Sequence, residues 1–222
     1  MEVSLMSEQE QITRIRVQYT KGPSLRFTGH LDLQRLWERL LRRSALPVRY
    51  SRGFHPRARL NLASALPLGF VSEAELLDFW MDEPLPVDEI NNRLSATAPP
   101  GMTIKSVRFV DLQEDALQSQ MTASEFEVSF FDPQEKEALQ KKVRILLAED
   151  KVLRTRRKKI YDLRPLILAL QAVTLADGEV GLQMRLSAEP GATGRPDEVL
   201  NALDYQATDY LVQRTRLILS DE

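Results

Sequence analysis

Residues 26–69 read RFTGHLDLQRLWERLLRRSALPVRYSRGFHPRARLNLASALPLG, and they join a basic helix, an aromatic loop and a short strand. Pro47 limits the helix on its C-terminal side, because the residue before a proline disfavours the α conformation. Residues 58–65 (ARLNLASA) alternate as a strand does. The helix is predicted over residues 31–44 because its apolar residues recur at i, i+3 and i+4: Leu33, Leu36, Trp37, Leu40 and Leu41.

The segments around this stretch complete a regular order of elements. Residues 12–20 precede it as a strand, and residues 74–81 follow it as the partner of the strand at 58–65. A second helix is predicted over 86–98, and residues 103–110 form a closing strand. The resulting order, β-α-β-β-α-β, is the split βαβ arrangement of ferredoxin-like domains.

The second half of the chain repeats this order at a period of roughly 110 residues, which suggests a tandem duplication. Its predicted elements are a strand at 125–131, a helix at 133–148, one or two strands within 152–174, a strand at 179–188, a helix at 197–203 and a strand at 210–219. The sequence therefore predicts an α+β fold of two tandem ferredoxin-like (βαββαβ) domains, with antiparallel sheets and helices on one face. The expected divisions are a loose N-terminus at 1–12, a first domain at 13–111, a linker at 112–123 and a second domain at 124–220.

Composition limits the classes of protein that the chain can represent. The 222 residues are 43% hydrophobic and 28% charged, so the chain can bury a core and is not of disordered composition. It has no cysteine, which excludes disulfides, thiolate zinc sites and cysteine-bound iron–sulfur clusters. No apolar run approaches the roughly 20 residues that span a bilayer, and residues 1–11 lack the pattern of a signal peptide. We expect a soluble cytoplasmic protein with no membrane association.

Positive charge is concentrated locally in a chain whose net charge is -2. Twelve Lys or Arg residues lie between Arg14 and Arg59, interrupted by two acids, Asp32 and Glu38. Within the predicted helix, Arg35, Arg39 and Arg42 share the face opposite the apolar residues. Such a concentration of arginine favours a surface that meets a polyanion, although a solvated helix face is the plainer interpretation.

The loop SRGFHP at residues 51–56 is the sharpest local motif. Gly53 permits a positive φ or a close backbone approach. Phe54 and Tyr50 could stack on bases, at about 1–3 kcal/mol for each stacked base. Aromatic rings between basic residues in a loop suit single-stranded RNA. The alternative is a tight turn in which Phe54 fills the core.

A second basic run, KVLRTRRKK at residues 151–159, is predicted to form a β-hairpin with a cationic tip that grips phosphates or is simply solvated. Asp162 and Arg164 flank Leu163 and are interpreted as a structural pair or as ligand contacts. The predicted RNA- or phosphate-binding residues are therefore Arg35, Arg39, Arg42, Arg43, Arg52, Gly53, Phe54, His55, Arg57, Arg59, Arg154, Arg156, Arg157, Lys158, Lys159 and Arg164.

Catalytic signals are weak by comparison. His30 precedes the predicted helix and is the one candidate general base, but Thr28 or His30 acting as a helix cap explains it equally well. The chain contains no HExxH or H-x-E spacing, so neither a catalytic metal nor a cofactor is predicted. Residues 73–89 carry seven acids and no base, and one acidic face could dock a basic partner.

Several motifs together resemble the bacterial DUF2344 family of radical-SAM-linked proteins. They are FTGHLDL (27–33), LLRRS (40–44), YSRGFHP (50–56), ALPLG (65–69) and KKIYDLRP (158–165), and the resemblance covers about residues 13–219. It implies a partner, because members of the family are encoded beside, or fused to, a radical S-adenosylmethionine protein. Some lie near ribonuclease E/G-type genes. This chain has no cysteine and so cannot itself hold the radical cluster.

Three functional hypotheses follow. The first is an RNA-binding adaptor that works with a radical-SAM enzyme in RNA modification or processing. The second is a metal-independent endoribonuclease in which His30 is the general base. The third is a subunit that docks on a radical-SAM partner through protein contacts alone.

Overall fold

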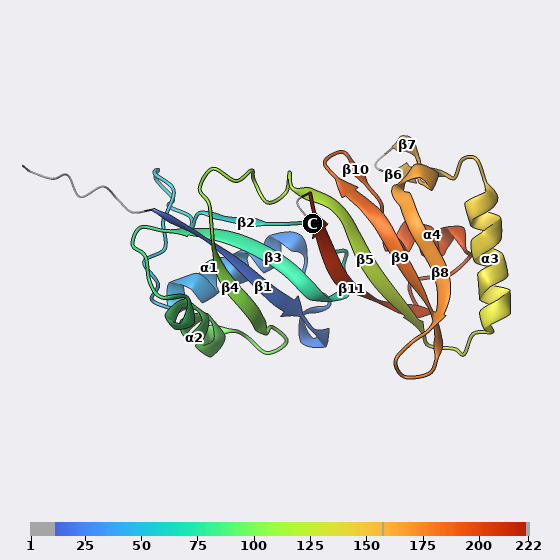
Figure 1. The fold of residues 1–222 in the computed structure, drawn as a ribbon, viewed down its shortest axis with the longest axis horizontal. Helices are drawn as coiled ribbons and strands as arrows, with labels where there is room; N and C mark the ends of the chain where they lie inside the picture. Colours follow the sequence, from blue (N-terminus) through green and yellow to red (C-terminus); the bar gives the residue numbers. More distant parts are fainter. Residues whose placement is uncertain (1–11, 157, 221–222) are drawn as a thin grey trace, which may run out of the picture.

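The computed structural model describes residues 12–156 and 158–220 as a mixed α+β fold built on one large, mostly antiparallel sheet (Figure 1). The first half follows the predicted order. Its strands are β1 (Thr13–Lys21), β2 (Leu60–Leu62), β3 (Val71–Met81) and β4 (Ile104–Val110), its helices are α1 (His30–Arg43) and α2 (Val87–Thr97), and a 3-10 turn, η1, covers Pro23–Leu25.

The second half contains the predicted elements and a separate two-stranded hairpin, β6–β7. Its elements are β5 (Met121–Phe130), α3 (Lys136–Ala148), β6 (Leu153–Arg156), β7 (Lys159–Asp162), the 3-10 turn η2 (Arg164–Leu166), β8 (Ile167–Thr174), β9 (Val180–Glu189), β10 (Ala192–Thr193), α4 (Pro196–Ala202) and β11 (Tyr210–Leu219). None of the helices that the structure describes is long and apolar enough to cross a bilayer.

Strands from the two halves form a single nine-stranded sheet instead of the two separate sheets expected. In the first half the order is β4-β1-β3, with β2 on the far edge of β3; in the second it is β11-β5-β9, with β8 beyond β9. The two sets meet where β11 pairs with β3, the one parallel pairing among the described strands. Residues near this junction therefore come from both halves of the chain.

Each half has its own core between helices and sheet. In the first, Trp37 of α1 packs edge-on against Tyr19 of β1, with ring centroids 4.8 Å apart, which confirms the predicted apolar face of α1. In the second, α3 lies beside β8, and buried residues of α3 and α4 share one core with those of β5, β8, β9 and β11. Glu75 is the cross-strand partner of Tyr19 and so lies on the side that faces the first-half helices. Arg214 is the cross-strand partner of Phe126 and so lies on the side that faces the second-half helices. Glu75 and Arg214 form an ion pair with each other, so both point to the same side of the sheet. The helices of both halves therefore lie on one side of the sheet.

Residues 111–120, which overlap the linker predicted at 112–123, pack over the other side of the first-half strands. Arg14 donates to the main-chain carbonyls of Glu114 and Asp115 at 2.6 and 2.8 Å. The Gln118 side-chain amide donates to the Leu62 carbonyl at 2.7 Å. Leu117 is fully buried. This segment therefore covers the polar side of β1 and β3.

Candidate nucleic-acid interface and seam pocket

The arginines of α1 lie on its exposed side, as the helical spacing predicts. The Arg35 guanidinium pairs with Asp32 at 3.2 Å, and Arg39 Nε donates to the Arg35 carbonyl at 3.3 Å. Arg43 donates to the Thr97 carbonyl at 3.0 Å. Arg42 has no hydrogen bond or ion pair from its side chain within the described residues. Of these four arginines, Arg35 alone is held by a carboxylate.

The loop at residues 51–57, called here the aromatic loop, is a closed projection. A β-bridge between Tyr50 and Ala58 ties its base, and Ser51 N donates to the Arg57 carbonyl at 2.8 Å. Arg57 N donates in return to Ser51 Oγ at 3.0 Å. All seven residues are exposed. Phe54 is 103% exposed, so the alternative in which it fills the core is wrong.

The side chains around Phe54 are free to meet a ligand. Arg52, His55 and Arg57 make no side-chain hydrogen bond or ion pair to any described residue. Arg59, just beyond the loop, lies over the Trp80 ring at 4.3 Å. Gly53 does not have a positive φ, and no described atom lies within 4 Å of where its Cβ would stand, so the fold of the loop itself does not require glycine there.

Part of the positive charge counted in the sequence is used inside the fold. Arg14 and Arg16 of β1 are buried, and both pair with Asp78, at 2.6 and 2.8 Å. Lys21 is also buried and donates to the carbonyls of Arg26 and Phe70 at 3.2 and 3.0 Å. Burial lowers the pKa of Lys21 from 10.5 to about 8. These three bases cannot contribute to a surface site.

The acidic stretch at residues 73–89 does not form one acidic face. Glu75 and Asp78 are buried in ion pairs with arginines. Asp82 pairs with Arg49 at 2.8 Å, and Glu89 pairs with an arginine on its own helix. Arginines therefore compensate four of the seven acids, and two of those four are buried, so the stretch cannot present all of its acids on one face.

The second basic run forms the predicted hairpin, β6–β7, at a distance from the aromatic loop. Figure 1 shows the hairpin over the half that α3 and α4 cover, while α1 and α2 lie at the other end of the molecule. Arg156 and Lys159 close the strand pairing beside the turn, and Lys158, in the turn, has a φ of 66°. Arg154 is partly buried, and Arg157 lies outside the described residues. The two basic regions are thus separate surfaces.

Arg164 is engaged within the fold. Its guanidinium donates to the carbonyls of Leu147, at the end of α3, and Ile167, at 3.1 and 3.5 Å. Asp162 Oδ1 accepts from the main-chain N of Val152 and of Arg164, at 2.8 and 3.0 Å. Both residues are therefore structural, although they do not pair side chain to side chain as the sequence suggested.

His30 is the first residue of α1 and is exposed. The helix cap is Gly29, and no side chain of the described residues bonds to the free amides, so the prediction that Thr28 or His30 caps the helix is wrong. No hydrogen bond or ion pair links the His30 ring to another residue of the described chain. His30 therefore has no partner that would orient it as a base.

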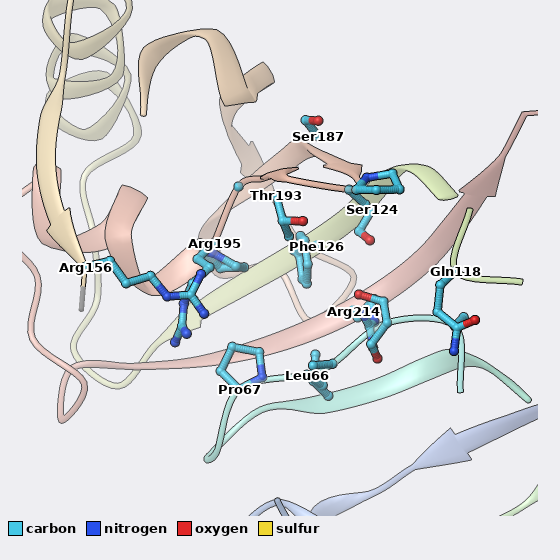
Figure 2. Close-up of a pocket in the computed structure, with 17 residues that line it drawn as sticks. Leu66, Pro67, Gln118, Ser124, Phe126, Arg156, Ser187, Thr193, Arg195 and Arg214 are labelled. Carbon is cyan, nitrogen blue, oxygen red and sulfur yellow. The ribbon is translucent and has the colours of Figure 1, made fainter. Parts of the chain in front are cut away.

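A cavity of about 430 Å³, the seam pocket, opens where the two halves meet. Figure 2 shows Arg156 and Arg195 entering it from one end and Arg214 lying further in, near Phe126 and Leu66. Sequence reasoning missed Arg195 and Arg214, because each stands outside the basic runs. The lining also includes residues 63–67 of the first half, with Gln118, Ser124, Ser187 and Thr193.

Two arginines of the seam pocket are each held by a carboxylate. Arg195 grips Asp197 through Nε and Nη2, at 2.9 and 2.6 Å, and this hydrogen bonding raises its pKa. Arg214 grips buried Glu75 through the same two nitrogens, also at 2.9 and 2.6 Å. Arg156 forms no hydrogen bond or ion pair with the rest of the described chain. The pocket is therefore lined by guanidinium groups of fixed orientation and by one that is free.

Comparison with known proteins identifies a family. The family described as "Uncharacterized protein conserved in bacteria (DUF2344)" matches residues 14–196. No curated protein matches the sequence. Among solved structures, a Cbf5–Nop10–Gar1 complex is similar at 7% identity and a TM-score of 0.45, over 92% of this chain and 48% of that one. A chain of an H/ACA RNP bound to a substrate RNA is similar at 8% identity and a TM-score of 0.44, over 92% of this chain and 47% of that one. This chain spans about half the length of those chains, and such scores carry no functional argument.

Proposed function

We propose that the chain, which belongs to the DUF2344 family, is an RNA-binding accessory protein that holds single-stranded RNA at the aromatic loop. One observation carries the proposal. Phe54 is fully exposed at the tip of a closed loop, between two arginines, Arg52 and Arg57, that have no partner among the described residues. An exposed aromatic ring between free cations is the arrangement that stacks a base and neutralises its phosphates.

The construction of the loop supports this role. The Tyr50–Ala58 bridge and the paired hydrogen bonds between Ser51 and Arg57 fix the base of the loop before any ligand arrives. A preformed loop loses less conformational entropy on binding than a flexible one. The exposed arginines of α1, above all Arg39 and Arg42, supply additional cations for phosphates. Affinity through such contacts depends strongly on salt.

The radical-SAM partnership is the finer part of the proposal and rests on the family resemblance. The adaptor would present RNA to a cytoplasmic radical S-adenosylmethionine enzyme, since the chain has no cysteine with which to bind the cluster. The compensated acids of residues 73–89 argue against docking through an acidic face. No observation favours the endoribonuclease alternative, because His30 lacks an orienting partner within the described chain.

The tandem architecture is likewise proposed. The strand orders β4-β1-β3-β2 and β11-β5-β9-β8 support two ferredoxin-like units that arose by duplication, each with the order 4-1-3-2. The hairpin β6–β7 would then be an insertion in the second unit. This division corresponds to domains at 13–111 and 124–220, joined through the β3–β11 pairing.

The test is a titration of the full chain with a fluorescent single-stranded RNA at several salt concentrations. Phe54→Ala removes the stacking ring, and we expect binding to weaken by about 5- to 100-fold, in line with the loss of one stacked base. Phe131→Ala is the matched control, because Phe131 is also an exposed phenylalanine, at 61%, but lies in the second half. Both proteins should keep wild-type thermal stability.

Two results would overturn the proposal: a log–log salt slope near zero, or equal affinities for the Phe54→Ala and Phe131→Ala variants. Gel analysis of the same RNA after prolonged incubation tests the endoribonuclease hypothesis. That hypothesis requires cleavage products with the wild-type protein and none with the His30→Ala variant. If the aromatic loop instead captures a radical-SAM protein after nuclease treatment, without binding RNA, the protein-docking hypothesis replaces ours.

A further inference from the structure

We propose that the seam pocket is a binding site for a phosphorylated small organic molecule of nucleotide type. The site lies apart from the aromatic loop: none of the residues of α1 or of residues 51–57 line it. Its volume of about 430 Å³ falls within the range of small-molecule sites. The proposal therefore goes beyond RNA binding and does not depend on it.

The orientation of two guanidinium groups carries the argument. Arg195 and Arg214 each present the Nε–Nη2 edge to a carboxylate, Asp197 and Glu75 respectively. A guanidinium has five N–H donors in a planar fork, so binding along that edge leaves the Nη1 donors for another acceptor. Because the carboxylates hold both planes, a ligand would not have to order them. That preorganisation favours a compact anion with several oxygens.

Arg156 supplies the net positive charge. The carboxylates of Asp197 and Glu75 compensate Arg195 and Arg214, whereas Arg156 has no carboxylate partner in the described part of the chain. Arg156 reaches the pocket from β6, which belongs to the separate two-stranded hairpin and not to the large sheet that carries Arg214. Arg156 enters the pocket from the same end as Arg195, and two guanidinium groups at one end are suited to a phosphate group, which accepts bidentate hydrogen bonds from arginine.

The rest of the lining defines the kind of molecule that bears the phosphate. Leu66, Pro67 and Phe126 form an apolar wall, which inorganic phosphate alone would leave uncovered. Ser124 and Thr193 bring hydroxyl groups that can orient a sugar or a ring. A few polar groups in a largely apolar pocket are typical of cofactor and nucleotide sites. The combination favours a phosphate joined to a ring-bearing body.

The test is isothermal titration of the full chain with adenosine 5′-monophosphate, inorganic phosphate and adenosine as probes. We expect the monophosphate to bind more tightly than either fragment. Arg156→Gln should weaken it by about 10- to 100-fold, the loss of one charge-assisted contact. Arg195→Gln is the second variant, with thermal melts to check its fold. Arg144→Gln, an exposed arginine of α3 that does not line the pocket, is the matched control and should bind as wild type.

Equal affinity for the monophosphate and adenosine, or equal effects of Arg156→Gln and Arg144→Gln, would overturn the proposal. Competition by a short RNA, with and without a terminal phosphate, shows whether the bound phosphate belongs to an RNA end or to a free nucleotide. Displacement of the monophosphate by the phosphorylated RNA alone points to an RNA end, and no displacement by either RNA points to a free nucleotide. Phe54→Ala separates the two proposals, because it should reduce RNA affinity and leave monophosphate binding unchanged.

Discussion

Arginines of β1 and of the aromatic loop belong to one basic segment of sequence and serve opposite purposes in the fold. Arg14 and Arg16 are 3% exposed and share the carboxylate of Asp78, which is itself fully buried. Arg52 and Arg57 are exposed, and their side chains have no partner among the described residues. The difference lies in what distant parts of the chain bring to each arginine: β3 and residues 111–120 cover the first pair and leave the second uncovered.

The comparison shows that charge density along a sequence overstates charge on a surface. A buried arginine whose carboxylate partner is fixed by a strand pairing is part of the core, whatever its neighbours in sequence. An exposed arginine that has no carboxylate partner among the described residues is therefore a candidate ligand contact, as are Arg39, Arg42, Arg52 and Arg57 in the first half and Arg156 in the second. Arg195 and Arg214 are a separate case, because each is paired with a carboxylate and also lines the seam pocket.

The largest effect is expected from Asp78→Ala. This substitution leaves the two buried guanidinium groups of Arg14 and Arg16 without their shared anion, so we expect a loss of about 3–5 kcal/mol in the free energy of unfolding. Urea denaturation followed by circular dichroism measures it. Asp88→Ala, at an exposed acid on α2, is the control and should change stability by less than about 0.5 kcal/mol. A loss below about 1 kcal/mol for Asp78→Ala would contradict the structural role.

Lys21 allows a test through pH. Its pKa is lowered by burial from 10.5 to about 8, so between these values the unfolded chain binds more protons than the folded one. Lys21 should therefore make the free energy of unfolding increase with pH, by about 1 kcal/mol per pH unit from pH 8 to 10. Lys21→Met should lack this contribution. Parallel stability curves for the two proteins over that range would show that the lysine is not desolvated.

A double substitution on α1 tests the exposed arginines. Arg39→Gln with Arg42→Gln should leave stability within about 0.5 kcal/mol, because neither side chain has a carboxylate partner in the described chain. If both contact phosphates, the log–log salt slope for single-stranded RNA should fall by about 1.4 in magnitude. Lys141→Gln with Arg144→Gln on α3 is the matched control. An equal loss of slope in both doubles would indicate nonspecific attraction.

The smallest effect is expected at the exposed pair of Asp32 and Arg35. Both side chains are more than 60% exposed, so solvent screens their attraction. Asp32→Ala should change the free energy of unfolding by less than about 0.5 kcal/mol, and its removal should slightly strengthen RNA binding because it frees Arg35. Unchanged RNA affinity for this variant would place the ligand away from α1.

Local periodicity predicted most of the elements. The apolar spacing of α1 and the alternation in β1, β3, β9 and β11 depend on residues close in sequence, and the structure has each of these elements within a few residues of the predicted limits. The aromatic loop was found for the same reason, since its glycine, proline and basic residues adjoin. The exposure of Phe54 was not determined, because a loop residue can point inward or outward with the same sequence.

Long-range pairings account for what the sequence did not reveal. Arg14 and Arg16 lie on the side of β1 opposite to Ile15 and Val17, yet nothing local in the sequence indicates that residues 111–120 bury that side. The seam pocket depends on β11 meeting β3 and on the approach of residues 63–67 to the second half. One weak signal existed: the Arg195-Pro196-Asp197 spacing, in which a fork can bind a carboxylate two residues away.

The location of β11 has a consequence for biosynthesis. This strand, the last that the structure describes, lies between β5 and β3 in the middle of the sheet. Until the ribosome has released it, β5 lacks its partner on one edge and part of β3 is uncovered, and open strand edges invite association with other chains. The two halves of the nascent protein therefore cannot join until β11 has been synthesised, and the chain is exposed to chaperones and to misassembly throughout that interval.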